Sequence, residues 1–340
     1  MADCFVKGCG SAPVISLKYC GEDLCRKHFL KKTWKRIKRH TAQGELVVSG
    51  DRVAIGYSAG KDSTALLHVF HELFSKRKDI SLVAITIDEG ISGYRPPSLR
   101  LAKKICKALG IRHIVVSAEK EFGKTIDSVA GKLAKTSGGR GLAPCSYCGV
   151  VRRYLLNKAA QRERATKVAT GHNLDDEAES VLMDFVRGDV QKMVRLGPKV
   201  GVSRFSGFVQ RIKPLRSVPE REVAAFALLN NWEFDSSVCP YSSFALREKV
   251  REAINSLESE HPGTKYSIVS TADKILPSIR KGFPGVEPKI CKSCGELSSR
   301  EICRFCEYVL GERGPSSEKK RGATNPESQG IRSLERGRVK

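Results

Sequence analysis

Short apolar runs alternate with longer segments of helical periodicity through the middle of the chain. The apolar runs are typical of buried β-strands, and they lie at Arg52–Tyr57, Ser81–Ile87, Arg112–Ser117 and Lys167–Gly171. Hydrophobic residues recur with helical spacing between and after these runs, at Ser98–Leu109, Cys148–Arg162, Glu220–Asn230 and Phe244–Glu260. Strands that alternate with helices predict an α/β fold with a doubly wound parallel sheet. In such a sheet, ligands bind beyond the carboxyl ends of the strands.

Both ends of the chain depart from this pattern. We expect a cysteine-rich module at residues 1–31, a central domain at 32–287, a second cysteine-rich module at 288–311 and a basic disordered tail at 312–340. No apolar run approaches the ~18 residues of a membrane span, and no cleavable signal sequence is visible after Met1. These features predict a cytoplasmic protein without a membrane partner.

The chain is strongly basic. Lysine and arginine number 60 against 37 aspartate and glutamate residues, so the formal net charge is +23. Such an excess indicates a polyanionic partner, of which RNA fits best, unless it only reflects a generally basic proteome. A basic helix is predicted from Arg26 to Arg39, in which Trp34 either stacks on a base or packs in the core. The face of this helix that we expect to meet RNA phosphates carries Lys31, Lys32, Lys35, Arg36 and Arg39.

One loop carries the clearest sign of chemistry. It spans residues 58–63, reads SAGKDS, and joins the first predicted strand to an apolar helix. Free N–H groups and the dipole at a helix N-terminus attract anions, and Lys61 adds a full positive charge. The loop therefore predicts a phosphate-binding site, because an ordinary strand–turn–helix joint needs no lysine and aspartate together. It is not a Walker A loop, since three residues separate Gly56 from Gly60 and Asp62 follows the lysine.

Two cysteine pairs near the C-terminus form the strongest metal signal. Two residues separate Cys291 from Cys294, and two separate Cys303 from Cys306. Four thiolates at this spacing can converge tetrahedrally on one Zn²⁺ and leave no open position. We therefore predict a structural zinc site.

The N-terminal cysteines allow more than one ligand set. Cys25 and His28 have the spacing of a metal-binding knuckle, whereas Cys4 and Cys9 are set wider than the commonest spacing. Cys20 is a fifth candidate for four positions. We favour Cys4, Cys9, Cys25 and His28 over a set that includes Cys20. Together with the C-terminal site, this cluster predicts two zinc ions per chain.

Three further cysteines form a looser pattern. Two residues separate Cys145 from Cys148, and Cys239 follows far along the chain. Three thiolates can hold a metal site with one open position for chemistry, or act as a redox pair with a separate nucleophile. The spacing does not decide between these roles and three unrelated cysteines. Cys106 lies in an amphipathic segment and is expected to be a buried hydrophobic residue.

Together, the loop and the cysteine patterns resemble a known family. Over residues 1–311 the chain is similar to the TtcA/TtuA group of tRNA 2-thiolation enzymes, which are PP-loop ATP pyrophosphatases, and it looks most like the TtuA branch. Besides the loop, the resemblance rests on segments 87–91 (IDEGI), 144–149 (PCSYCG), 152–157 (RRYLLN), 171–178 (GHNLDDEA), 239–242 (CPYS) and 255–263 (NSLESEHPG). Ala59 departs from the family pattern, where a second glycine is usual, and it carries strain if this position needs a positive φ.

The resemblance implies a catalytic PP-loop domain at 32–287 and zinc modules at both ends. It also implies a 4Fe–4S cluster on Cys145, Cys148 and Cys239, with one iron free to hold sulfur. The implied cofactors further include ATP and Mg²⁺ on the loop. The implied partners are tRNA and a ubiquitin-like sulfur-carrier protein with a C-terminal thiocarboxylate, and a homodimer is one assembly that we consider.

The implied reaction transfers AMP to O2 of a uridine, which makes that oxygen a good leaving group, and then places sulfur at C2. Asp62, Arg152 and Asp176 are the expected catalytic residues. Arg152, often lysine in the family, would stabilise charge at the α-phosphate but cannot readily donate a proton. Asp176 would bind Mg²⁺ or orient the uridine, unless it only caps a helix. ATP would be held, with adenine near the end of the second strand, by Ser58, Gly60, Lys61, Asp62, Ser63, Ile87, Arg152, Gly171 and Asp176.

Other functions are weighed against this one. The segment Cys239-Pro240-Tyr241 favours the T-loop uridine, whereas a sister branch modifies the wobble uridine. A zinc-containing RNA-binding protein with an inactive loop is the alternative from another class, and the intact Lys61-Asp62-Ser63 argues against it. An amidotransferase-type synthetase does not fit, because the length leaves no room for a glutaminase domain.

Overall fold

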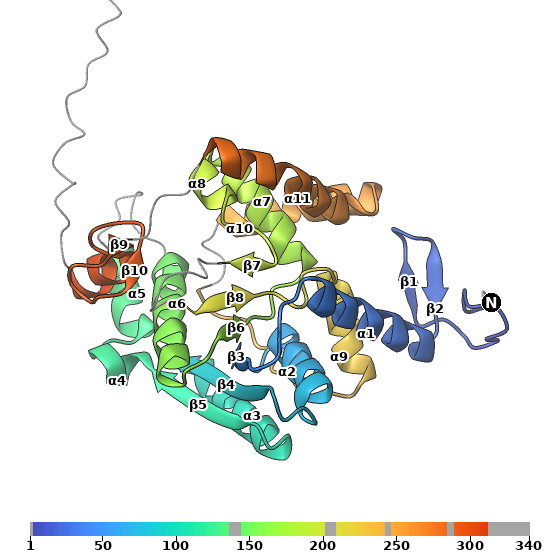
Figure 1. The fold of residues 1–340 in the computed structure, drawn as a ribbon, viewed down its shortest axis with the longest axis horizontal. Helices are drawn as coiled ribbons and strands as arrows, with labels where there is room; N and C mark the ends of the chain where they lie inside the picture. The colour runs from blue at the N-terminus through green and yellow to red at the C-terminus, as the bar shows by residue number, and fades with distance from the viewer. Residues whose placement is uncertain (1–2, 136–143, 201–208, 242–245, 284–288, 312–340) are drawn as a thin grey trace, which may run out of the picture. The chain divides into compact units, whose positions relative to one another are not determined.

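The computed structural model describes residues 3–135, 144–200, 209–241, 246–283 and 289–311 (Figure 1). It separates into two compact units, residues 1–288 and 289–340. The predicted tail at 312–340 lies outside the described residues, as do the first two residues of the helix predicted from Phe244.

A six-stranded sheet forms the centre of the first unit, in the order β5-β4-β3-β6-β8-β7. Neighbouring strands pair in parallel except β7, which is antiparallel to β8. The predicted strands are confirmed, whereas β7 and β8 were not predicted because polar residues interrupt these short segments. The strands are β3 (Arg52–Gly56), β4 (Ser81–Asp88), β5 (Arg112–Ser117), β6 (Lys167–Ala169), β7 (Lys199–Val200) and β8 (Gln210–Ile212).

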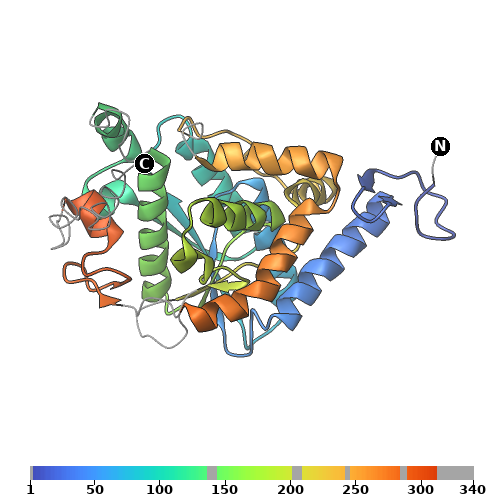
Figure 2. The ribbon, with the colours of Figure 1, turned by 90° about the horizontal axis from the view of Figure 1, so that it is seen from above.

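Helices cover both faces of this sheet, so the doubly wound α/β fold is confirmed (Figures 1 and 2). Figure 1 shows α6 (Pro144–Arg162) on the opposite side of the sheet from α2. A single apolar core joins residues of four helices on the α2 side. These are α1 (Arg26–Gln43), α2 (Lys61–Phe74), α3 (Arg95–Ala108) and α9 (Glu220–Leu229).

A separate group of helices packs around α7 (Leu174–Val186). Its apolar residues Leu174 and Ala178 form a small core with Val250, Ile254 and Val269. The last three belong to α10 (Leu246–Glu260) and α11 (Thr264–Gly282). The shorter α4 (Ala118–Phe122), α5 (Ile126–Lys135) and α8 (Val190–Met193) are the other helices among the described residues of this unit. Within the described ranges, no helix combines the length and the apolar character that a bilayer crossing demands.

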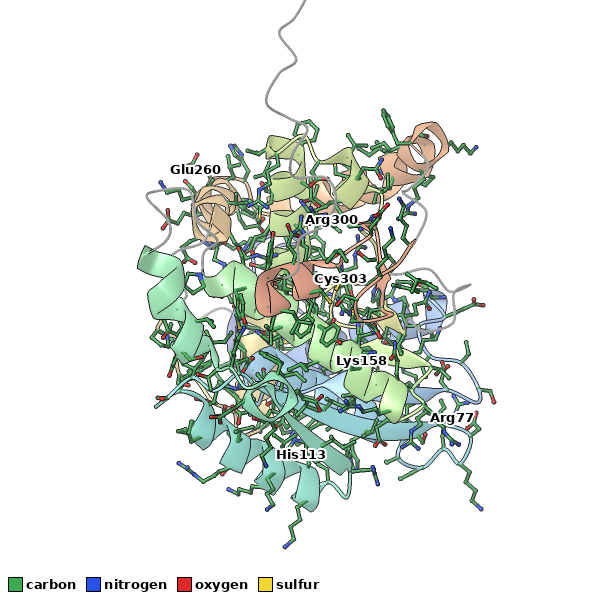
Figure 3. The ribbon with its side chains drawn as sticks, turned by 90° about the vertical axis from the view of Figure 1, so that its left-hand side faces the viewer. Arg77, His113, Lys158, Glu260, Arg300 and Cys303 are labelled. Carbon is green, nitrogen blue, oxygen red and sulfur yellow. The ribbon has the colours of Figure 1, made fainter. Side chains whose placement is uncertain are left out.

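Small two-stranded sheets build both cysteine-rich ends. At the N-terminus, β1 (Ile15–Leu17) pairs with β2 (Glu22–Leu24). In the second unit, β9 (Lys289–Ile290) pairs with β10 (Leu297–Ser298), and a single wide helical turn, η2 (Cys306–Leu310), follows. Figure 3 labels Cys303, which comes just before that turn.

Strand β3 determines where the ligand site lies. Its residues Val53, Ala54 and Ile55 are fully buried, as expected for a central strand that is covered on both faces. The strand ends at Gly56, and α2 begins at Lys61. The predicted phosphate loop therefore occupies the short connection at the carboxyl end of the sheet, where the doubly wound fold places ligands.

Candidate active site and metal centres

Internal hydrogen bonds hold the phosphate loop in shape. The Ser58 and Ser63 hydroxyls lie 3.1 Å apart, the Ser58 N–H donates to Ser63 Oγ at 3.2 Å, and Ser63 Oγ donates to the Gly60 carbonyl at 3.0 Å. Gly60 precedes α2 in an extended conformation, and no side chain caps this helix end. The first N–H groups of α2 are therefore available to an anion.

Ala59 adopts φ = 65°, in the left-handed region. The strain that we expected at this departure from the family pattern is confirmed. Ala59 also anchors a distant segment, because its carbonyl accepts the Asp235 N–H at 2.8 Å. An alanine in this conformation costs roughly 1–2 kcal/mol relative to the right-handed region.

Gly171 lets the end of β6 approach the loop closely. A Cβ built at this position would lie 2.9 Å from the Asp62 carbonyl carbon and 3.0 Å from the Ser63 nitrogen. Both are backbone atoms, so no rotamer change could relieve the clash. Only a glycine at position 171 therefore lets the loop backbone lie against this segment.

Lys61 lies between two carboxylates. Its Nζ is 3.0 Å from Asp62 Oδ2 and 2.6 Å from Glu220 Oε1. Burial lowers the pKa of Lys61, but the two carboxylates outweigh this effect and the net shift is upward. Burial also raises the pKa of Asp62, although Lys61 and the amide of Asn173, 3.1 Å from Oδ1, favour its charged form. Sequence reasoning missed Glu220, because an acidic residue at a helix start is typical of capping.

A cavity of about 250 Å³ opens beside the loop, at the ends of β3, β4 and β6. A larger hollow of about 670 Å³ lies beside Tyr19 and the start of α11, but no residue of the loop lines it. The smaller cavity is the candidate active site, because it gathers most of the residues predicted to bind ATP. Its lining includes Ser58, Gly60, Asp62, Ser63, Ile87, Glu89, Arg152, Gly171, His172 and Asp176.

Arg152 enters the cavity from α6. Its Nε lies 3.1 Å from Glu89 Oε1, while Arg95 Nε lies 2.6 Å from Glu89 Oε2. Glu89 raises the pKa of Arg152 more than any other group, so the guanidinium stays charged. Sequence reasoning quoted Glu89 within a motif but gave it no role. Arg95 also donates to the Ile87 carbonyl, so that backbone oxygen is already engaged at the place predicted for adenine.

Asp176 has two structural partners. Its Oδ2 accepts the Asn173 N–H at 3.2 Å, and the Asn173 side chain accepts the Asp176 N–H, so the two form a capping box at the start of α7. Its Oδ1 accepts from Arg247 at 3.1 Å. Asp176 therefore does cap a helix, and it lines the cavity at the same time.

The three central cysteines lie close to the cavity. Cys148 is one helical turn before Arg152 on α6, and Cys145 donates its thiol hydrogen to the Tyr241 carbonyl at 2.7 Å. Burial raises the pKa of Cys148 to about 12, whereas the nearby Arg152 lowers it. Cys239 raises the pKa of both other thiols, which places all three within electrostatic reach. Within the described residues, however, only the two end clusters bring at least three ligand atoms within 4.8 Å of one another.

This wider arrangement fits a cluster better than a single ion. The ligands of one zinc must crowd around one atom, whereas those of a 4Fe–4S cluster bind separate irons. The segment that carries Cys239 is held at both sides, since Asp235 bonds to Ala59 and the Tyr241 hydroxyl donates to Asp127 Oδ1 at 2.9 Å. The three thiols thus have the residue type and the fixed supports that a cluster needs.

The N-terminal module gathers four ligand atoms within 4.8 Å of one another: those of Cys4, Cys9, Cys25 and His28. His28 Nδ1 lies 3.3 Å from Cys4 Sγ and 3.4 Å from Cys25 Sγ. Cys20 is exposed and bonds instead to the Leu17 carbonyl. The structure thus has the favoured set of four together and leaves Cys20 outside it.

The C-terminal module gathers Cys291, Cys294, Cys303 and Cys306 in the same way. The Sγ–Sγ distances are 3.8 Å for Cys291 and Cys306 and 3.7 Å for Cys294 and Cys303. Four sulfurs at 2.3 Å from one tetrahedral zinc would lie about 3.8 Å apart. Both end clusters can therefore hold a metal ion.

The basic helix α1 is only partly exposed. Lys31, Lys35 and Arg39 are exposed, as predicted for a face that meets phosphates. Arg36 is not part of that face, because it bonds to Glu222 at 2.8 Å and to the hydroxyl of Tyr19. Lys32 pairs with Glu22. Trp34 packs against the core, so of its two predicted roles the structure has core packing and not stacking on a base.

A parallel sheet whose central strand ends in a phosphate loop defines a nucleotide-binding α/β protein. The family model described as PP-loop domain matches residues 30–257. The tRNA 2-thiolation protein NcsA of Haloferax volcanii is 36% identical, over 88% of this chain and 97% of its own length. The tRNA-5-methyluridine(54) 2-sulfurtransferase of Pyrococcus horikoshii is 32% identical, over 89% and 92%.

A solved structure extends this similarity to three dimensions. The U34-tRNA thiolase NcsA from Methanococcus maripaludis, determined with its 4Fe-4S cluster, is 34% identical and matches with a TM-score of 0.75. The match covers 92% of this chain and 96% of that one. The chain belongs to the PP-loop family, among the tRNA 2-thiolation sulfurtransferases, so the family expected from the sequence is confirmed.

Proposed function

We propose that this protein activates O2 of a tRNA uridine with ATP and then replaces that oxygen by sulfur at C2. One arrangement supports this most directly: α6 presents Arg152 to the cavity and Cys148 one turn earlier. A single helix therefore joins the site for activation to the thiols. The relatives named for tRNA thiolation supply the substrate class.

The loop residues bind the phosphates of ATP in this proposal. The pyrophosphate faces Ser58, Ser63 and the N–H groups after Gly60. Lys61 breaks its ion pair with Glu220 and neutralises the negative charge of the pyrophosphate. Mg²⁺ enters with the phosphates and takes Asp62 as a ligand, since hard cations prefer carboxylate oxygens. The binding set is completed by Ile87 for adenine and by Arg152, Gly171 and Asp176.

The remaining catalytic roles follow from existing contacts. Arg152 is held by Glu89 and stabilises negative charge on the α-phosphate as it is attacked. We assign Asp176 the orientation of the uridine rather than Mg²⁺ binding, because Asp62 already supplies the carboxylate ligand for Mg²⁺ in this proposal. Its bonds to Asn173 and Arg247 fix it for that task.

Metal binding divides between three places. Each end cluster would hold a structural zinc, with Cys4, Cys9, Cys25 and His28 in one and Cys291, Cys294, Cys303 and Cys306 in the other. Cys145, Cys148 and Cys239 would hold a 4Fe–4S cluster, which supplies a position where sulfur binds before transfer. The corresponding domains are zinc modules at 1–31 and 288–311, a catalytic domain at 32–287 and a disordered basic tail at 312–340.

The resemblance also suggests partners. A ubiquitin-like carrier with a C-terminal thiocarboxylate would deliver sulfur in the cytoplasm, and two copies of the chain would assemble as a homodimer. Transfer of sulfur from such a carrier, followed with labelled sulfur, tests the first statement. Sedimentation of the purified protein tests the second.

The target uridine has two candidates. The segment Cys239-Pro240-Tyr241 resembles the T-loop branch, to which the relative named for position 54 belongs. The solved structure favours the wobble position, because that protein is a U34-tRNA thiolase. Mapping thiouridine in tRNA from a deletion strain distinguishes them: the missing modification lies at one position or the other.

The reaction itself is tested with protein purified without oxygen. Iron, zinc and sulfide are counted per chain, and ATP, tRNA and sulfide are added. We expect two zinc ions and four irons, release of pyrophosphate that depends on tRNA, and thiouridine in the product. Lys61→Ala is the matched control that keeps the metals. Binding of tRNA without pyrophosphate release would instead favour a zinc-containing RNA-binding protein.

A further inference from the structure

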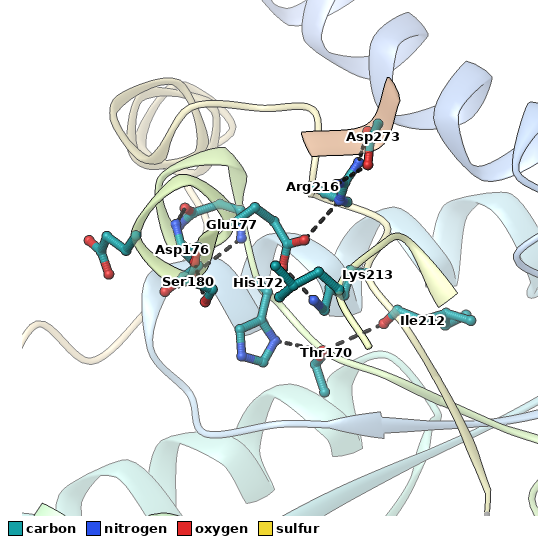
Figure 4. Close-up of polar contacts among 12 residues, drawn as sticks. Thr170, His172, Asp176, Glu177, Ser180, Ile212, Lys213, Arg216 and Asp273 are labelled. Carbon is teal, nitrogen blue, oxygen red and sulfur yellow. Dashed lines mark hydrogen bonds and ion pairs between the residues drawn. The ribbon is translucent and has the colours of Figure 1, made fainter. Parts of the chain in front are cut away.

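His172 is a titratable residue of the cavity to which the proposed mechanism gives no role. It lies between β6 and α7, next to Gly171, and lines the same cavity as the phosphate loop. Its Nδ1 is 2.8 Å from Thr170 Oγ1. Figure 4 shows this one dashed line at the imidazole ring, while the second nitrogen has none.

Thr170 determines which ring nitrogen carries the hydrogen. The N–H of Thr170 donates to the carbonyl of Ile212 in β8 at 3.0 Å, which holds Thr170 against that strand. The hydroxyl of Thr170 reaches the same carbonyl at 3.5 Å. A hydroxyl that donates to Ile212 has its lone pairs left to accept Nδ1–H from His172. The other nitrogen, Nε2, is then unprotonated and acts as an acceptor.

The surroundings keep this imidazole neutral. The His172 side chain is exposed, but partial desolvation in the cavity lowers its pKa and is the largest effect. Asp176 and Glu177 of α7 raise it, whereas Lys213 after β8 and Arg247 of α10 lower it. Glu177 is itself neutralised by Lys213 and Arg216, as Figure 4 shows. The net shift is downward, so Nε2 is free at neutral pH.

The proposed reaction needs such a group. The O2 of a neutral uracil is a weak nucleophile, and loss of the N3 hydrogen places negative charge on it. The described carboxylates of the cavity are engaged elsewhere: Asp62 pairs with Lys61 and is assigned to Mg²⁺, Asp176 pairs with Arg247, and Glu89 pairs with Arg95 and Arg152. Arg152 cannot accept a proton.

We propose that His172 is the general base of the activation step, an inference that rests on the proposed function. Nε2 takes the proton from N3 of the uridine while O2 attacks the α-phosphorus of ATP. The bond from the α-phosphorus to the oxygen that bridges it to the β-phosphate breaks, and pyrophosphate leaves with that electron pair. The products are an O2-adenylated uridine without a hydrogen on N3, pyrophosphate and an imidazolium at His172.

The test compares His172→Gln with the unchanged protein. Glutamine can form hydrogen bonds but cannot accept a proton. We measure single-turnover release of pyrophosphate, with saturating ATP and unmodified tRNA transcript, from pH 5 to 8. Because the pKa of His172 is lowered, the unchanged protein should lose rate only at a pH below the ordinary imidazole pKa of about 6.5. His172→Gln should be roughly 10²-fold slower or more and should lack this loss at low pH.

A matched control uses another histidine that bonds to a threonine. His113 Nε2 lies 2.8 Å from Thr86 Oγ1 and is outside the cavity lining, so His113→Gln should keep the rate and its pH dependence. His172→Ala with added imidazole should recover activity, which a purely structural role would not produce. ATP affinity should be the same in every variant.

Three results separate the outcomes. If the unchanged protein releases no pyrophosphate with tRNA, the proposed function fails. If it does, and His172→Gln keeps the loss of rate at low pH, His172 is not the base. A slow His172→Ala that imidazole does not recover, with ATP affinity unchanged, would likewise overturn the proposal.

Discussion

The end modules and the central cysteines use the same side chain in opposite ways. Each end module gathers four ligand atoms within 4.8 Å, and backbone N–H groups donate to its sulfurs, as Cys303 does to Cys291 Sγ at 3.2 Å. The central thiols come from two distant segments, and one of them, Cys145, donates instead to the Tyr241 carbonyl. In the proposed function, four ligands from short loops close a zinc site, whereas three ligands from two distant segments leave a cluster position open for sulfur.

The largest expected effect comes from the open site. Cys148→Ser should abolish thiolation and the absorbance of the cluster together, because it removes one of the three thiols assigned to the cluster. ATP binding should survive, since Cys148 does not line the cavity. Product analysis, visible absorbance and ATP titration check the three statements. Full thiolation by iron-free protein would break the comparison and favour a persulfide on one cysteine.

Next in size is the loss of the loop charge. Lys61→Ala removes the cation that faces Asp62 and Glu220, so pyrophosphate release should fall by about 10²-fold or more. Zinc and iron contents should not change, because the loop contributes no thiol. An unaltered rate would mean that Lys61 does not contact the phosphates of ATP.

A smaller effect is expected in the closed site. Cys294→Ser removes one of four ligands, so zinc should fall by one per chain and the C-terminal module should lose its structure. ATP affinity should stay the same, because the substitution leaves the loop at 58–63 untouched. Metal analysis and hydrogen exchange over residues 289–311 provide the measurement. Retention of both zinc ions would remove Cys294 from the ligand set.

The smallest effect concerns neither kind of metal site. Ala59→Gly should relieve the strain at φ = 65° and raise the free energy of unfolding by roughly 1 kcal/mol, because the added flexibility of the unfolded chain offsets part of the gain. Denaturant titration measures this, with metal contents as the control. A loss of stability would show that the packing of the alanine methyl group contributes more free energy than the backbone strain costs.

The parts of the molecule that follow from local spacing were predictable. The strands, the loop at 58–63 and the C-terminal ligand set all rest on residues close together in sequence. Contacts across the chain were not predictable, because no local signal marks them. Arg36 was assigned to an exposed face, yet it meets Glu222 of α9, and the pairing of Lys61 with Glu220 has the same cause. Glu89 stood in a recognised motif, but its two arginine partners come from different helices.

The hydrogen bond from Asp235 to Ala59 also limits the distance between Cys239 and the phosphate loop. Asp235 is pinned to the phosphate loop, and Cys239 follows four residues later. Four residues reach at most about 14 Å when fully extended. As long as that bond is intact, the covalent chain sets an upper limit on the distance between the sulfur of Cys239 and the nucleotide, even when the surrounding helices move. A glycine–serine insertion between Asp235 and Cys239 would raise this limit without changing either residue.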